Sequence, residues 1–116
     1  MSDQNLSVVV HAVRSSFETG KIPEALLLSL YQSYAQIPNL GEFIRQSAKL
    51  FPKLNCGIAS VYLQHLLGRG KVIQGKYAGE CHTFLYLEDQ TVVDITADQY
   101  GGPAVYMGKL QTPWSF

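Results

Sequence analysis

The sequence has no excess of charge of either sign and no long apolar run. Its 116 residues include nine basic and nine acidic side chains, so the formal net charge is zero. A basic excess attracts nucleic acid, and its absence gives a nucleic-acid partner no support. No apolar run reaches the ~18 residues that a transmembrane helix needs, so no membrane partner is predicted.

Cysteine is also scarce. The two cysteines are too few for a disulfide framework, and both are predicted to be reduced thiols. The first residues lack the basic region and the small-residue cleavage site of a signal peptide. The expected location is the cytoplasm, either of the producing cell or of a target cell into which the chain is delivered. The length suits a single domain over residues 1–116.

The spacing of apolar residues changes after Gly70. Before it, four stretches have helical spacing, over residues 7–20, 22–36, 39–51 and 56–67. After it, the apolar stretches are short, rich in β-branched and aromatic residues, and separated by turn formers. The fold class is therefore predicted to be α+β, with helices over residues 1–69 packed on an antiparallel sheet of three or four strands over residues 70–116.

Each predicted helix has an apolar stripe that is expected to face the core, because its positions recur at the period of one helix face. Asn39 is the predicted cap of the third helix. The stripes are Val9, Val13 and Phe17; Leu26, Leu27, Leu30, Tyr31 and Tyr34; Phe43, Ile44 and Leu50; and Ile58, Val61, Tyr62, Leu66 and Leu67.

Cys56 stands where the fourth helical stretch begins, between Asn55 and Gly57. A helix N-terminus has unsatisfied N–H groups and about half a positive charge, and both favour a thiolate. The pKa of a cysteine there falls from ~8.5 toward ~3.5–7.5, most of all beside a histidine. Gly57 removes side-chain bulk next to the sulfur. Cys56 is therefore a candidate nucleophile, and a buried free cysteine without a chemical role is the common alternative.

Of the three histidines, His82 is the candidate base. His65 lies on the same predicted helix as Cys56, about 13 Å further along its axis, which is too far for proton transfer. His11 has no polar companion in its helix and is expected to be structural. His82 opens the strand "HTFLYLE", and the following strand brings the carboxylate of Asp94 back beside it.

The hairpin "HTFLYLEDQTVVDIT" decides whether His82 and Asp94 meet. A turn centred on Asp89 pairs His82 with Thr96, which leaves His82 and Asp94 as diagonal neighbours on one face. A two-residue loop would put them on opposite faces. Asp94 also interrupts "VVDI", where a buried carboxylate needs a partner. The predicted catalytic triad is Cys56 as nucleophile, His82 as proton carrier and Asp94 as the orienting carboxylate.

Three further residues, Asn55, Gly57 and Gln99, are predicted to bind substrate or its oxyanion. For Gln99 the alternative is a simple turn, which the glycines after it would suit. Cys81 points to the opposite face from its neighbour His82 and is expected to be a core residue. Because adjacent strand residues cannot face one ion, no metal site is predicted, and no cofactor is expected.

The order of the three triad residues resembles the papain-like and transglutaminase-like cysteine enzymes. In that superfamily the nucleophilic cysteine begins a helix packed on an antiparallel sheet, and the histidine and an Asp or Asn lie on adjacent strands. The segment "HTFLYLEDQTVVDITADQYGG" is similar to the histidine–aspartate segment of small bacterial members, some of which accompany polymorphic toxin systems or peptide maturation. The resemblance covers residues 54–108, and "DITADQY" is its more specific part.

Two departures bear on what the resemblance implies. Phe84 stands where a tryptophan two residues after the histidine is usual. Papain-like proteases carry a glutamine before the cysteine for the oxyanion hole. Here Gln46 is well removed from Cys56, so the backbone N–H of Cys56 is the expected donor. The short chain also leaves little room for a deep peptide cleft, which favours action on one side chain, one bond or one partner.

The resemblance implies a cysteine-dependent acyl-transfer enzyme acting on a peptide or carboxamide bond, as a protease, a deamidase or a transglutaminase. It implies a protein or peptide substrate and, for a bacterial toxin or effector domain, a cognate inhibitor or immunity protein. Two other hypotheses stay open: an RNA-cleaving toxin with His82 as acid and base, and a binding module without chemistry. The neutral composition weighs against the first, and the reactivity of Cys56 tests the second.

Overall fold

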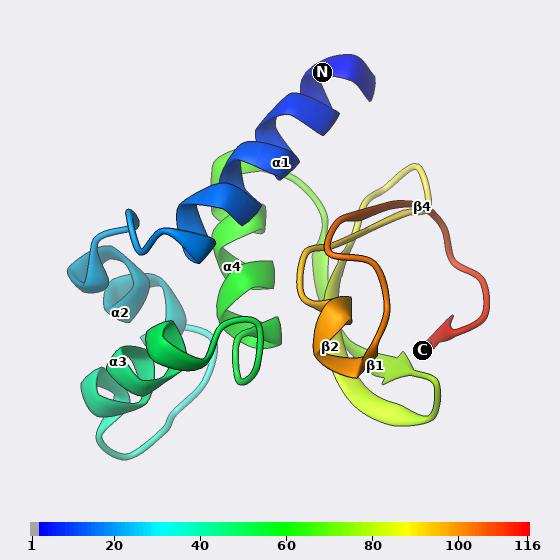
Figure 1. Ribbon diagram of the computed structural model, residues 1–116. Coiled ribbons are helices and arrows are strands. Elements are labelled where there is room, and N and C mark those ends of the chain that lie inside the picture. The colour runs from blue at the N-terminus through cyan, green and yellow to red at the C-terminus, as the bar shows by residue number, and fades with distance from the viewer. Residues whose placement is uncertain (1–2) are drawn as a thin grey trace.

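A helical half is followed by a single sheet. The computed structural model describes residues 3–116, with side chains from residue 5 onward. Within this part of the chain the helices are α1 (Asp3–Glu18), α2 (Glu24–Gln32), α3 (Leu40–Leu50) and α4 (Cys56–Leu67). The strands are β1 (Lys71–Tyr77), β2 (Glu80–Tyr86), β3 (Thr91–Asp94), β4 (Tyr106–Lys109) and β5 (Trp114–Ser115), and a short 3-10 helix, η1 (Ala97–Tyr100), follows β3. Figure 1 shows the helices on one side and the sheet on the other.

The predicted α+β class is confirmed, but the predicted number of strands is wrong. The described residues form one antiparallel sheet of five strands in the order β4-β3-β2-β1-β5. The additional strand is β5, which pairs with the end of β1 through Tyr77↔Trp114 and Lys76↔Ser115. A strand of two residues has no alternation of its own, so the sequence pattern gives no sign of it.

The sheet curls until its two edges approach each other. Strands β4 and β5 lie at opposite ends of the strand order, yet the rings of Tyr106 in β4 and Trp114 in β5 stack with their centroids 3.8 Å apart. The inner face of this curl buries a cluster centred on Tyr77, Phe84 and Val92. Strongly twisted sheets commonly close in this way. As a result, residues from the last strand reach the middle strands.

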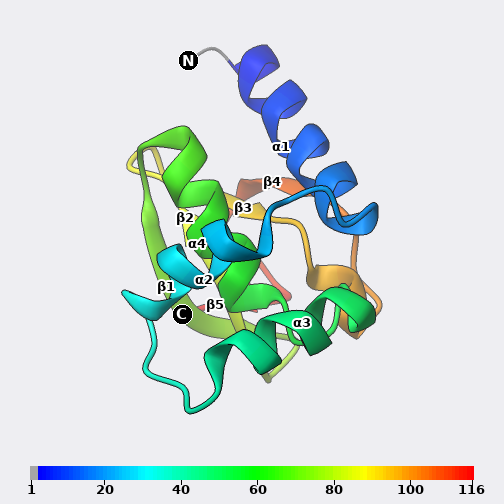
Figure 2. The ribbon, with the colours of Figure 1, turned by 90° about the vertical axis from the view of Figure 1, so that its left-hand side faces the viewer.

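The outer face of the sheet is covered by the helices. Figures 1 and 2 show α4 lying against the sheet, with α2 and α3 beyond it and α1 running across the end of the layer. The buried cluster here joins all four helices to Leu85, Leu87, Val93 and Ile95. Because α4 is packed on both sides, six of its residues are buried. None of the described helices is long and apolar enough to span a bilayer.

Two predicted core residues are wrong. Leu50 and Leu66 are 49% and 47% exposed. After α3, the chain turns so that Phe51 takes the inward place that was assigned to Leu50, and its ring stacks on Phe17 at 5.4 Å. In α4, Leu63 is buried in place of Leu66, although Leu63 was not part of the predicted stripe. The spacing of apolar residues predicts the ends of helices, and which residues of a narrow stripe are buried, less well than it predicts the helices themselves.

One helix end and one helix cap also differ from those predicted. The second helix ends at Gln32 and not at residue 36, because Tyr34 and Ala35 close the helix with hydrogen bonds to the carbonyl of Tyr31. Asn39 does precede α3, but its side chain makes no capping hydrogen bond. It has a left-handed backbone with φ 56°, which asparagine tolerates better than most residues.

Candidate active site

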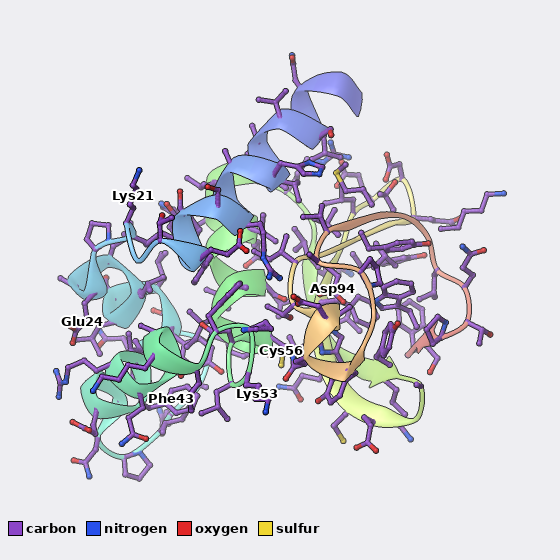
Figure 3. All side chains as sticks on the ribbon, viewed as in Figure 1. Lys21, Glu24, Phe43, Lys53, Cys56 and Asp94 are labelled. Carbon is purple, nitrogen blue, oxygen red and sulfur yellow. The ribbon has the colours of Figure 1, made fainter. Side chains whose placement is uncertain are left out.

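Cys56 is the first residue of α4 and is partly exposed. Asn55, which precedes it, makes no side-chain cap for the helix. The first N–H groups of α4 therefore have no acceptor from that side chain, and together with the helix dipole they favour an anion at Cys56. Figure 3 shows Cys56 where the helical layer meets the sheet, with Asp94 on the sheet side.

Asn55 holds the segment that leads into Cys56. Its side-chain nitrogen donates to the carbonyls of Ser47 and Lys53, both at 2.8 Å, and the residue is 2% exposed. Leu54, just before it, has φ 67°, a left-handed conformation that costs a branched residue free energy. The donors of Asn55 are thus occupied within the chain, and its predicted role in substrate binding stays a prediction.

His82 and Asp94 lie side by side, as the predicted register requires. Strands β2 and β3 pair Leu85 with Val93 and Tyr86 with Val92, which is the register of a turn centred on Asp89. His82 Nε2 lies 2.6 Å from Asp94 Oδ2, and both side chains are almost completely buried. The predicted pairing on one face is therefore confirmed.

Asp94 accepts from two more residues. The indole Nε1 of Trp114 donates to Oδ2 at 2.8 Å, and the backbone N–H of Thr96 donates to Oδ1 at 2.9 Å. The Thr96 hydroxyl lies 3.4 Å from the same Oδ1. A buried carboxylate is tolerated only when it is hydrogen-bonded, and here both oxygens have donors. The carboxylate is therefore held in one orientation toward the His82 ring.

The charges of Cys56 and His82 support each other. Burial raises the pKa of the Cys56 thiol, but interaction with the His82 ring and donation from Thr83 outweigh burial, so its pKa is lowered. Burial lowers the pKa of His82, but hydrogen bonding to Asp94 and attraction to Cys56 raise it to about 9. Each shift favours the charged form of its group, and thiolate with imidazolium is the reactive form of a cysteine nucleophile.

The two nitrogens of His82 have different surroundings. Nε2 is occupied by Asp94, whereas Nδ1 is buried and makes no hydrogen bond within the described residues. Nδ1 is thus the nitrogen left to exchange a proton with Cys56 or with a substrate. Such contacts are often long in a free enzyme and shorten when substrate binds. The rings of Tyr77 and Tyr100 pack edge-on against His82, with centroids 6.1 Å and 5.4 Å away, and restrict its movement.

Gly57 lies directly under the side chain of Tyr31. A Cβ on Gly57 would lie 2.5 Å from the Tyr31 hydroxyl oxygen, which is too close for any side chain. The sequence predicted that Gly57 clears space beside Cys56, and in the structure that space is filled by a phenol. Tyr31 was predicted only as a core residue.

Gln99 lies in η1, between two residues that are anchored. Asp98 binds the buried Arg14 of α1 through two hydrogen bonds of 2.8 Å and 2.7 Å. Tyr100 donates its hydroxyl to the carbonyl of Cys81 at 2.9 Å. The side-chain nitrogen of Gln99 is buried and has no hydrogen-bond partner among the described residues. Its predicted part in oxyanion binding stays a prediction, and Asp98 has a structural partner.

Cys81 is exposed, so its predicted place in the core is wrong. The side chain does alternate with that of His82, but none of the described helices covers the sheet at that point. Helix α4 reaches β2 at Thr83, whose carbonyl receives the Ser60 hydroxyl at 3.4 Å, and Cys81 lies beyond this contact toward the β1–β2 turn. The other histidines, His11 and His65, are exposed and belong to α1 and to the last turn of α4.

Three residues of the site were missed by sequence reasoning. Thr96 could have been found, because an aspartate that accepts from the backbone two residues later is a common turn. Arg14 stands among the apolar positions of α1, and a buried cation requires a buried partner, which is a usable signal. Trp114 offers no such signal, because it reaches Asp94 only through the curl of the sheet.

No protein-family model, curated protein or solved structure matches this chain. Function therefore has to be inferred from the chemistry of the site. Among the described residues no three His, Cys, Asp or Glu side chains are grouped so as to hold a metal ion. The arrangement that is present can activate a thiol, carry a proton and hold the proton carrier in place.

Proposed function

We propose that this chain is a cysteine-dependent acyl-transfer enzyme that acts on a peptide or carboxamide bond through Cys56, His82 and Asp94. The observation that carries the proposal is the buried contact of 2.6 Å between His82 and Asp94, next to a cysteine whose pKa the same ring lowers. A structural histidine needs one hydrogen-bond partner and has no need of a thiolate. Three polar groups aligned in this order are what nucleophilic catalysis requires.

The steps follow from the groups present. The Cys56 thiolate attacks the carbonyl carbon, and the C=O electron pair moves to oxygen. When the carbonyl re-forms, the C–N bond breaks and protonated His82 gives its proton to the leaving nitrogen, which leaves a thioester on Cys56. His82 then takes a proton from water or an amine as it attacks the thioester, and Cys56 is released. Asp94 keeps the ring oriented throughout.

The acceptor decides between a protease or deamidase, with water, and a transglutaminase, with an amine. The resemblance to papain-like and transglutaminase-like enzymes supports the class but not this choice. It also supports a role as a bacterial toxin or effector domain with a protein or peptide substrate, neutralised by a cognate inhibitor or immunity protein. The neutral composition gives an RNA-cleaving activity no support.

Alkylation tests the proposal directly. The chain is treated with iodoacetamide at about pH 6, where few ordinary thiols are ionised, and labelled cysteines are identified by mass spectrometry. Cys56 is expected to react much faster than the exposed Cys81, which serves as the internal reference. If Cys56 reacts no faster than Cys81, the proposed nucleophile is wrong and a binding module is the better hypothesis.

Acyl transfer is tested with p-nitrophenyl acetate, whose reaction leaves an acetyl group on the nucleophile. Wild-type chain should release p-nitrophenolate and carry acetyl on Cys56, and Cys56→Ala should do neither. A thiol at a helix end contributes little packing, so this variant should lose less than about 1.5 kcal/mol of unfolding free energy. Unfolded casein with and without a fluorescent primary amine then separates amine incorporation, ammonia release and chain cleavage.

A further inference from the structure

The ring of Tyr31 is held rigidly above the start of α4. The residue is 8% exposed. Its ring stacks on Tyr34 with centroids 5.4 Å apart and on Phe43 at 6.2 Å. A side chain fixed by two aromatic neighbours points its hydroxyl in one direction with little loss of entropy on binding a ligand.

The hydroxyl of Tyr31 is directed at the first turn of α4 and is not used by the fold. It lies where a Cβ on Gly57 would be only 2.5 Å away. Within the described residues it makes no hydrogen bond, although the hydroxyl of its neighbour Tyr34 accepts one from Gln74 at 3.0 Å. A phenol in a core normally finds a partner, so an unused hydroxyl beside a candidate nucleophile is a donor available to a ligand.

The Tyr31 hydroxyl also remains protonated. Burial raises its pKa most, and the charges of Tyr34 and Cys56 raise it further, to about 12. The phenol lies against Gly57, the residue that follows Cys56. A neutral phenol next to a thiolate has one thing to offer an incoming carbonyl, which is its proton as a hydrogen-bond donor.

We propose that the Tyr31 hydroxyl and the backbone N–H of Cys56 form the oxyanion hole of this site. The inference rests on the proposed acyl-transfer function. When the Cys56 sulfur bonds to the carbonyl carbon, the oxygen that receives the C=O electron pair lies beside the first turn of α4 and accepts from both donors. Tyr31 is then a catalytic residue, and it supplies the donor that an adjacent glutamine supplies in papain-like proteases.

Two reagents distinguish an oxyanion role of Tyr31 from stabilisation of the Cys56 thiolate. Reaction with p-nitrophenyl acetate passes through a tetrahedral oxyanion, whereas alkylation by iodoacetamide displaces iodide at a CH₂ group and forms none. Tyr31→Phe keeps the ring and its stacking but removes the hydroxyl. We expect the rate of acyl transfer to fall at least ~10-fold, since a lost oxyanion donor can cost ~10²–10³ in turnover, and the alkylation rate of Cys56 to stay within about twofold.

Tyr34→Phe is the matched control, because it removes a neighbouring phenol hydroxyl from the same stack. It should leave both rates unchanged, and thermal midpoints verify that both variants are folded. If both rates fall together in Tyr31→Phe, the hydroxyl stabilises the thiolate and the oxyanion role is overturned. If neither rate falls, Tyr31 has no part in the reaction, while a reactive Cys56 leaves the proposed function standing. A Cys56 that is inert in the wild type would instead remove the proposed function itself.

Discussion

The indole N–H of Trp114 donates to Asp94 Oδ2, the same oxygen that contacts His82 Nε2. Trp114 in β5 and Asp94 in β3 are separated by β2 and β1 in the sheet order, and they meet only because the sheet curls. A residue of the last strand therefore fixes the carboxylate that orients the proposed base. The hydrogen bonding of the site is therefore complete only with the C-terminal segment in place.

Trp114→Phe should destabilise the chain without unfolding it. A smaller aromatic ring remains, so part of the stacking on Tyr106 is retained, but Oδ2 of Asp94 loses one of its donors in a buried place. Leaving a buried acceptor short of a partner costs about 1–3 kcal/mol. Urea unfolding measures the change in free energy. A loss below a few tenths of a kcal/mol would mean that the indole N–H does not support Asp94.

A double-mutant cycle with Asp94→Asn isolates this contact. The two residues share a hydrogen bond, so the free-energy changes of the single variants should not add. We expect a coupling of about 0.5–3 kcal/mol between Trp114 and Asp94. Strict additivity would place the effect of Trp114→Phe in ring packing and not in the hydrogen bond.

Asp94→Asn should lower turnover more than it lowers substrate binding. The His82 ring would lose its anionic partner, so its pKa should fall from about 9. Losing the orienting aspartate of a serine protease costs on the order of 10⁴ in turnover, and a thiolate, already nucleophilic, should lose less, ~10-fold to 10³-fold. Histidine NMR titration and kinetics on one sample decide the matter. Normal turnover per folded molecule with an unchanged titration would remove Asp94 from the triad.

His82→Ala should make Cys56 a poor nucleophile at acidic pH. The ring lowers the pKa of Cys56 together with Thr83, and burial, which raises it, remains in the variant. The thiol pKa should therefore be higher in the variant than in the wild type. The rate of alkylation, followed from acidic to alkaline pH, reports the fraction of thiolate. An alkylation profile that does not move toward higher pH would show that His82 has no influence on the sulfur.

The His82–Asp94 pair could be predicted because its signal is local. A hairpin fixes side-chain facing through a period of two, so one assumption about the turn decided which face Asp94 takes. The start of α4 at Cys56 was predictable for a similar reason, since an apolar helical stripe begins there and Gly68 ends it.

The parts that could not be predicted depend on contacts between distant segments. Arg14 binds Asp98 across most of the chain, and Trp114 reaches Asp94 through a curl that no single strand encodes. The prediction for Cys81 was wrong for another reason. Its side chain points to the predicted face of the sheet. Whether that face is covered depends on where the neighbouring helix ends, and α4 does not extend over Cys81. Tyr31 was correctly predicted to be buried, and only the packing shows that its hydroxyl reaches Gly57.

Cys56 and His82 make the stability of the chain depend on pH in opposite directions. The pKa of His82 is raised from 6.5 to about 9, so its stabilisation is complete below ~6.5 and is lost as the pH rises through about 9. The pKa of Cys56 is lowered, so its stabilisation is complete above the ordinary thiol value of ~8.5 and is lost as the pH falls through the folded value.

In the part of the range between ~6.5 and ~8.5 that lies above the folded pKa of Cys56, these effects offset each other in the wild-type chain. The folded pair holds one proton, on the ring of His82, and the unfolded pair also holds one, on the sulfur of Cys56. Folding then takes up no net proton at this pair. Its contribution to the pH dependence of stability should be close to zero across that window.

Cys56→Ala removes the thiol, and with it the effect on stability that offsets that of His82. Above about pH 6.5 the unfolded variant holds no proton at either position, whereas Asp94 continues to favour a proton on folded His82. The unfolding free energy of the variant should therefore fall relative to wild type by up to ~1.4 kcal/mol per pH unit, until the pH reaches its own His82 pKa. Urea unfolding of both chains at about pH 6, 7 and 8 measures the difference. Parallel curves would mean that folded His82 does not carry the extra proton, and the thiolate–imidazolium pair would have to be abandoned.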